Sequence, residues 1–181
     1  MTRSAVHRLG IALVFFSALY WLSDLIEAVQ GGFSDWQLVI TLIAEAAIPF
    51  MVIGVYLVQR PRIGLLGLVS SIGYAYAFVF FTGTVVYALV DGTPDYDTMV
   101  DQIGVAITLH GAIMVLAGIG LGIAVTRAGV LPAWTGVMLG LGVVAVAATQ
   151  GAGEVIGLVA AGIRDLAFAG MGLAVLTSVD S

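Results

Sequence analysis

The chain is a succession of apolar runs, each long enough to cross a lipid bilayer, separated by short breaks rich in glycine, proline and charged residues. In lipid, a run of about 20 residues satisfies its own backbone hydrogen-bonding groups only as an α-helix. The sequence therefore predicts a single all-α integral membrane domain over residues 1–181. We expect a bundle of six transmembrane helices at 8–29, 37–59, 63–90, 100–126, 132–150 and 154–177.

The distribution of basic residues predicts how these helices are oriented. Arg3, Arg8, Arg60, Arg62 and Arg127 all fall in alternate breaks, whereas the remaining breaks contain acidic residues and no base. Arginine and lysine are concentrated on the cytoplasmic side of membrane proteins. We therefore expect both termini in the cytoplasm and a multi-pass protein of the cytoplasmic membrane.

Composition excludes several kinds of chemistry. The chain has no cysteine, no lysine and only two histidines, His7 and His110. A retinal Schiff base needs a lysine, and thiolate metal sites need cysteine. His7 lies at the N-terminal edge and His110 within a predicted helix, so this chain alone cannot form a bis-histidine haem site. We expect no metal site, and the net charge of −5 gives no reason to expect a nucleic-acid partner. The cofactor, if there is one, remains open.

Arg164 and Asp165 lie in the middle of the last apolar run. A guanidinium at that depth in a bilayer costs roughly 3 kcal/mol on insertion scales, so it requires a partner. Adjacent residues on a helix point about 100° apart, and for this reason we expect both partners to come from other helices. The preferred pairs are Arg164 with Glu45, and Asp165 with either His110 or a group on the first helix.

Three ionisable residues are predicted to lie at one level of the bundle. Glu45, His110 and Arg164 each fall about 15 Å from the non-cytoplasmic end of helices that run in the same direction. Pro49 follows Glu45 by four residues and cannot donate a backbone hydrogen bond to the Glu45 carbonyl. This carbonyl is therefore expected to face a cavity or a neighbouring helix.

The first predicted helix adds a polar stripe with helical spacing, formed by Ser17, Tyr20, Asp24 and Glu27. Tyr20 precedes Asp24 by four residues and could donate a hydrogen bond to it. Asp24 and Glu27 are either hydrated side chains near the membrane surface or ligands in the polar layer.

Two further patterns concern the architecture. The segments 45–67 and 110–140 share an ionisable residue, a glycine, an arginine and a proline in the same order, which suggests a parallel two-helix hairpin repeat. Glycine pairs four residues apart, at 118 and 122, 136 and 140, and 153 and 157, predict close helix contacts in the second half. The first half is rich in aromatic residues instead, so an apolar crevice between the halves could hold a lipid or another small hydrophobic ligand.

The stretch from Arg127 to Met138, RAGVLPAWTGVM, is followed by glycine-, alanine- and valine-rich helices, and Leu109-His-Gly111 begins the helix before it. This pattern resembles one found in many small uncharacterised polytopic membrane proteins and covers about the second half of the chain. Those proteins have no agreed activity, so the resemblance implies a polytopic membrane fold and no particular function.

The first functional hypothesis is a transport component, or a subunit of a homo-oligomer or larger membrane complex, that binds a small ligand, lipid or proton in a buried polar layer. Arg164 would hold an anionic group, Glu45 or Asp165 would exchange protons, and His110 would titrate near neutral pH. The candidate site residues are Glu45, His110, Arg164, Asp165, Asp24 and Tyr20.

Two other hypotheses stay open. The protein could be a membrane-embedded enzyme acting on a lipid or isoprenoid, with Glu45 or Asp165 as general acid or base and His110 as its partner. Alternatively, it could be a purely structural or assembly subunit in which the buried charges hold helices together. Composition alone does not separate these three classes.

Overall fold

The computed structural model describes residues 1–180, without the side chains of Glu154, Val179 and Asp180. Over these residues the chain is all-helical, as the sequence predicts, with seven helices and no strand. The helices are α1 (Arg3–Gln30), α2 (Asp35–Val58), α3 (Gly64–Asp91), α4 (Tyr96–Ile103), α5 (Val105–Ala128), α6 (Ala133–Ala148) and α7 (Glu154–Asp180).

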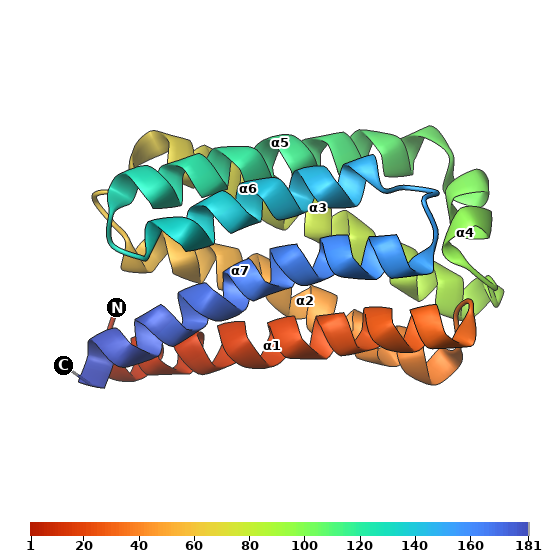
Figure 1. Ribbon diagram of the computed structural model, residues 1–181, viewed down its shortest axis with the longest axis horizontal. Helices are drawn as coiled ribbons and strands as arrows, with labels where there is room; N and C mark the ends of the chain where they lie inside the picture. The colour runs from red at the N-terminus through yellow and green to blue at the C-terminus, as the bar shows by residue number, and fades with distance from the viewer. Residues whose placement is uncertain (181) are drawn as a thin grey trace.

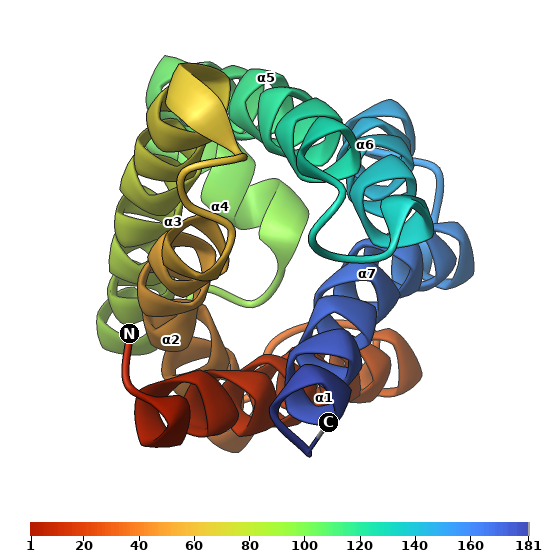
Figure 2. The same cartoon turned by 90° about the vertical axis from the view of Figure 1, so that its left-hand side faces the viewer.

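The six longer helices form a closed ring. Each of α1, α2, α3, α5, α6 and α7 packs against its neighbours in chain order, and α1 packs against α7 to close the circle. The view along the bundle shows this ring (Figure 2), and the side view shows that successive helices alternate in direction (Figure 1). Both termini and the α2–α3 and α5–α6 connections lie at one end, which we call the arginine end. The other connections, including α4, lie at the opposite, acidic end.

The predicted helix boundaries agree with the structure to within a few residues, except in two places. The first helix begins earlier than expected, at Arg3, and the predicted helix over 100–126 is broken. Gly104 adopts φ 64° and ψ −137°, a conformation that interrupts the helix between α4 and α5. Only glycine adopts such a backbone conformation without a steric penalty, because it lacks a Cβ.

Five helices are long and apolar enough to cross a membrane: α1, α2, α3, α5 and residues Val155–Ser178 of α7. The remaining member of the ring, α6, has 16 residues and is therefore about 24 Å long. That is shorter than the roughly 30 Å hydrocarbon core of a typical bilayer. Length and composition thus indicate a multi-pass membrane protein with five full-length candidate spans.

Large apolar side chains also cover the outside of the ring. Phe50, Val90 and Val105 are 80%, 83% and 84% exposed, respectively. A water-soluble bundle would place polar residues at most such positions, whereas lipid accepts them at no cost. Inside the ring, Leu13, Tyr74 and Phe78 are fully or almost fully buried and belong to one core cluster.

Close helix approach depends on particular glycines rather than on every glycine pair. Gly122 of α5 faces Gly136 of α6, and a Cβ on either would collide with the backbone carbonyl of the other. The predicted close approach at this pair of helices is therefore confirmed. A Cβ added at Gly122 would also lie 3.1 Å from the backbone N of Gly140, so the backbone of Gly140 belongs to this close contact. At Gly153 and Gly157 an added Cβ would meet no atom within 4 Å, so the close contacts predicted there are wrong.

The short helix α4 crosses the acidic end of the ring (Figure 2) and packs on it through one face. Tyr96, Met99, Val100 and Ile103 follow helical spacing, and all four belong to an apolar cluster with residues of α2, α3 and α5. Asp95 caps the helix by accepting a hydrogen bond from the Thr98 backbone N–H at 2.7 Å. The sequence showed the acids of this segment but not the helix, because its last four residues, 100–103, were assigned to the predicted span that follows and the others lay outside every predicted helix.

The cap makes the docking of α4 dependent on pH. The hydrogen bond from the Thr98 backbone N–H holds the pKa of Asp95 below its ordinary value. A lowered pKa in the folded state means that the cap stabilises α4 above the ordinary aspartate pKa, about 3.9, and is lost as the pH falls through the lower folded value. We expect Asp95→Ala at neutral pH to lower the hydrogen-exchange protection factors of residues 96–103 severalfold, and acid to lower the same protection factors in the wild type.

Asp97→Ala is the matched control for this prediction. It removes the same charge from the first turn of α4 but leaves the capping hydrogen bond intact. Equal acceleration of exchange in both variants would show that net charge, and not the cap, holds α4 in place.

Candidate buried polar site

Arg164 lies inside the ring with its side chain 6% exposed. Its Nε donates to Asp165 Oδ1 at 3.0 Å, and its Nη2 donates to Asp165 Oδ2 at 3.3 Å. The expectation that adjacent residues could not pair was therefore wrong. The arginine side chain is long enough to fold back across the angle between the two Cβ directions, and the fork of its guanidinium then matches the carboxylate.

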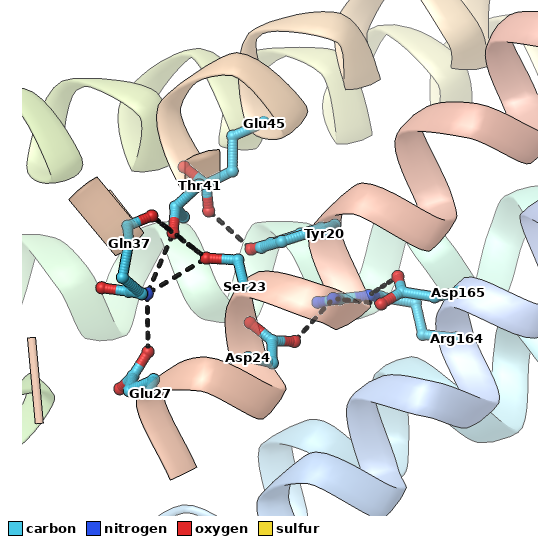
Figure 3. A network of polar contacts seen from close by, with 9 residues as sticks. All are labelled: Tyr20, Ser23, Asp24, Glu27, Gln37, Thr41, Glu45, Arg164 and Asp165. Atoms are coloured by element: carbon cyan, nitrogen blue, oxygen red, sulfur yellow. Dashed lines mark hydrogen bonds and ion pairs between the residues drawn. The ribbon is translucent and has the colours of Figure 1, made fainter. Parts of the chain in front are cut away.

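The same guanidinium connects α7 to α1. Its Nη2 lies 3.8 Å from Asp24 Oδ2, and its Cζ lies 4.6 Å from the centroid of the Tyr20 ring. Figure 3 shows Arg164 between these two residues of α1 and Asp165. Two carboxylates and an aromatic face thus compensate the only basic side chain in the ring interior within the described part of the chain.

Close packing of α6 keeps Arg164 in this position. A Cβ added to Gly142 of α6 would lie 2.6 Å from both the backbone N and the Cα of Arg164. Real side chains do not come this close to a neighbouring backbone. Glycine at this position therefore allows α6 to pack directly behind the arginine.

Glu45 is buried on α2, with 5% of the residue exposed. The Tyr20 hydroxyl donates to its Oε1 at 2.5 Å, while its Oε2 has no hydrogen-bond partner among the described residues. The predicted pairs were wrong in two respects: Arg164 does not form an ion pair with Glu45, and Tyr20 bonds Glu45 instead of Asp24. Tyr20 stands between the two charges, with its ring against the guanidinium and its hydroxyl on the carboxylate (Figure 3).

A second group of polar side chains lies between α1 and α2, nearer the acidic end. The amide nitrogen Nε2 of Gln37 lies 3.1 Å from Ser23 Oγ, 3.1 Å from Thr41 Oγ1 and 3.3 Å from Glu27 Oε2. Ser23 and Thr41 also contact each other, and Ser23, Gln37 and Thr41 are all buried. We call Glu27, Ser23, Gln37 and Thr41 the polar cluster.

Ser23, Gln37 and Thr41 were not predicted as members of a polar site, although the sequence contains a pattern that indicates them. Gln37, Thr41 and Glu45 are spaced by four residues and therefore lie on one face of α2. Ser23 comes directly before Asp24 on α1, within the stripe already recognised. Uncharged polar side chains are a weaker signal than charges in an apolar helix. They still need hydrogen-bond partners there, because burying an unpaired polar group costs free energy.

His110 lies away from this site. Its ring stacks on Phe80 of α3 with centroids 3.7 Å apart, and its Nε2 lies 3.0 Å from the hydroxyl of Tyr76, which is 54% exposed. Because a carbonyl only accepts, the 2.7 Å contact with the Ala106 carbonyl places a proton on Nδ1. The predicted pairing of His110 with Asp165 was wrong, since the imidazole is turned toward α3 and not toward the ring axis.

The residues that suggested an internal repeat therefore do not occupy equivalent places. Glu45 faces the ring interior, whereas His110 lies in the contact between α5 and α3. Of the six candidate site residues, the structure brings Tyr20, Asp24, Glu45, Arg164 and Asp165 together and leaves His110 out.

The charges inside the ring do not balance. Among the side chains that the structure describes there, Arg164 is the one base, and Asp24, Glu45 and Asp165 are three acids. Asp24 and Asp165 are both within ion-pair distance of Arg164, which leaves Glu45 without a direct counter-charge. A buried, unmatched carboxylate is costly, so this group is the part of the site that must be compensated in some other way.

Further polar groups at this depth have no partner in the described part of the chain: Ser17 Oγ, Ser71 Oγ and the Tyr74 hydroxyl. Tyr74 packs against Phe78 and Phe168, with ring centroids 5.0 and 6.0 Å away. Aromatic side chains from both halves of the chain thus meet in the interior, where a crevice between the halves was expected.

Among the side chains that the structure describes, no three of the kinds that bind metals are grouped closely enough to hold a metal ion. No protein-family model matches this chain, and neither the curated proteins nor the solved structures include a detectable match. The functional argument therefore depends on the geometry of the site.

Proposed function

We propose that this protein is a transport component or membrane-complex subunit in which Glu45 binds and releases a proton inside the ring. In this proposal α6 is the sixth span, and the arginine end, with both termini, faces the cytoplasm. The observation that carries the proposal is a buried Glu45 carboxylate with one unpartnered oxygen, in an interior that holds three acids and one base.

The imbalance of charge favours a proton as the bound species. If all four side chains were ionised, the interior would carry two excess negative charges, which apolar surroundings disfavour strongly. A proton or a small cation on Glu45 would reduce this excess. A proton needs no cavity, and neither the hollow between α6 and α7 nor the hollow at the arginine end is lined by Glu45, Tyr20 or Arg164.

The polar cluster supports access to Glu45 from the acidic end. Glu27 lies in the last turn of α1, Gln37 joins it to Ser23 and Thr41, and Glu45 follows Thr41 by one turn of α2 (Figure 3). Toward the arginine end, the interior is instead filled by apolar core side chains such as Val52, Val55 and Leu121. A proton would therefore reach Glu45 along the polar cluster from one side.

Helix α4 lies over the entrance to this route. Burial raises the pKa of Tyr96, the first residue of α4, and the nearby carboxylates of Glu45, Glu27 and Asp97 raise it further. These carboxylates can influence Tyr96 only because α4 lies close to the acidic ends of α1 and α2. The docking of α4 on this end of the ring would then control how freely water reaches Glu27.

A structural role for the same charges is the second candidate, and the contacts of Arg164 favour it. This side chain links α7 to Asp24 and Tyr20 of α1, which are the two helices that close the ring. In a purely structural subunit Glu45 would keep one protonation state over the whole range of pH in which the protein is folded.

Infrared difference spectroscopy of the protein in lipid separates the two candidates. If Glu45 exchanges a proton, lowering the pH should produce the C=O stretching band of a carboxylic acid in apolar surroundings. This band should disappear in Glu45→Gln and persist in Asp91→Asn, which removes an exposed acid at the acidic end. An unchanged band in folded Glu45→Gln, or no such band in the wild type, would exclude Glu45 as the proton carrier.

A further inference from the structure

The arginine end of the ring is strongly cationic. Arg3, Arg8, Arg60, Arg62 and Arg127 all lie there, at the start of α1, in the α2–α3 connection and at the end of α5. None of the Asp and Glu side chains that the structure describes lies at this end. The concentration of arginines alone is typical of the cytoplasmic side of a membrane protein and indicates no ligand.

A hollow of about 330 Å³ opens at this end and gives one of these arginines a specific setting. Its walls come from α1, α2, α7 and the α2–α3 and α5–α6 connections, which all reach the end of the ring that faces the viewer in Figure 2. The lining is mostly apolar: Val6, Leu57, Val58, Val130, Leu131, Ala174 and Val175, together with Met1, Ser178 and Arg60.

Arg60 has the only charged side chain in this lining, to which Met1 adds the N-terminal amine. Its guanidinium carbon lies 6.0 Å from the centroid of the Tyr56 ring, and it makes no ion pair with any acidic side chain that the structure describes. An arginine that lacks a carboxylate partner keeps its donors available for an oxyanion. Apolar walls next to it would remove an alkyl or aromatic group of the same ligand from water.

We propose that this hollow binds a small amphipathic oxyanion, namely a carboxylate or phosphate carried on a short apolar chain, with Arg60 holding the oxyanion. A volume of about 330 Å³ is at the lower end of the range for small-molecule pockets. Arg60 follows Glu45 by 15 positions in the sequence, roughly 20 Å along the direction of α2, with packed apolar core between them. This site is therefore separate from the buried carboxylate.

Calorimetric titration of the full-length protein in zwitterionic nanodiscs tests the proposal, with acetate, butanoate and hexanoate as probes. Each methylene that enters the hollow should tighten binding by about fourfold. Hexylammonium, which has the same chain and the opposite charge, should not bind. Discs containing phosphatidylglycerol distinguish two sources of the anion: a lipid headgroup in the site would weaken hexanoate binding, whereas a soluble occupant would leave it unchanged.

Two variants and a matched control locate the site. Arg60→Gln should weaken hexanoate binding at least about tenfold, the effect of losing a charged hydrogen bond. Ala174→Phe should fill the hollow and abolish binding with Arg60 intact. Arg127→Gln removes an equivalent exposed charge from the same end but not from the lining, and it should bind hexanoate normally. Equal binding by folded Arg60→Gln, or an affinity that does not depend on chain length, would overturn the proposal.

Discussion

Arg164→Met is expected to destabilise the protein by about 3 to 5 kcal/mol, the usual cost of removing one partner from a buried ion pair. Asp165 and Asp24 would lose their counter-charge, and α7 would lose its contact with the Tyr20 ring. Methionine keeps most of the side-chain volume, so the loss reports on charge rather than on a cavity. The destabilisation should shrink at acid pH, because a protonated carboxyl group needs no counter-charge.

Reversible unfolding in mixed micelles provides the measurement. The double variant Arg164→Met/Asp165→Asn should recover part of the stability, since it removes a charge from each side of the pair. Arg127→Met is the control for loss of an exposed arginine, which forms no ion pair within the described residues. If Arg164→Met and Arg127→Met unfold alike, the buried charges do not hold the ring together.

Gly142→Leu is expected to cost about 3 kcal/mol, at the upper end of the usual range for overpacking. The first atom of any side chain at this position would lie 2.6 Å from the backbone of Arg164. Because a helix backbone cannot move aside as a flexible side chain can, α6 and α7 would have to separate. That shift would also displace the guanidinium from Asp24 and Tyr20.

Gly140→Leu tests this reasoning on the same helix. A Cβ at Gly140 meets no atom within 4 Å, and leucine has a better helix propensity than glycine. We expect this control to be neutral or slightly stabilising in the same unfolding assay. Similar losses in both variants would mean that α6 does not tolerate leucine in general, and that the contact with Arg164 is not the cause.

The interior charges and the stability of the ring are connected by this geometry. Arg164 compensates two carboxylates, and Tyr20 lies between it and the third, Glu45. In the proposed function the protonation of Glu45 could therefore change without breaking the ion pairs that join α7 to α1. This separation would allow one buried polar region to serve both as a structural clamp and as a proton site.

The helices and most of their boundaries followed from the sequence, because apolar run length and turn-forming residues act locally. The buried positions of Glu45, Arg164 and Asp165 also followed, since a charge in the middle of an apolar helix has few alternatives to the protein interior. The same reasoning failed for His110. A moderately polar ring can be satisfied by a tyrosine and a backbone carbonyl in the contact between two helices.

The partners of the buried side chains could not be predicted from local sequence patterns. The sequence by itself determined that this chain is helical, apolar on its outside and obliged to compensate an arginine in its interior. Only the tertiary structure decided that Asp165 and Asp24 are the partners, that Tyr20 separates the guanidinium from Glu45, and that Gly104 divides one predicted helix into two. Helix formation depends on residues within a few turns, whereas these contacts depend on the relative rotation of packed helices and on the reach of individual side chains.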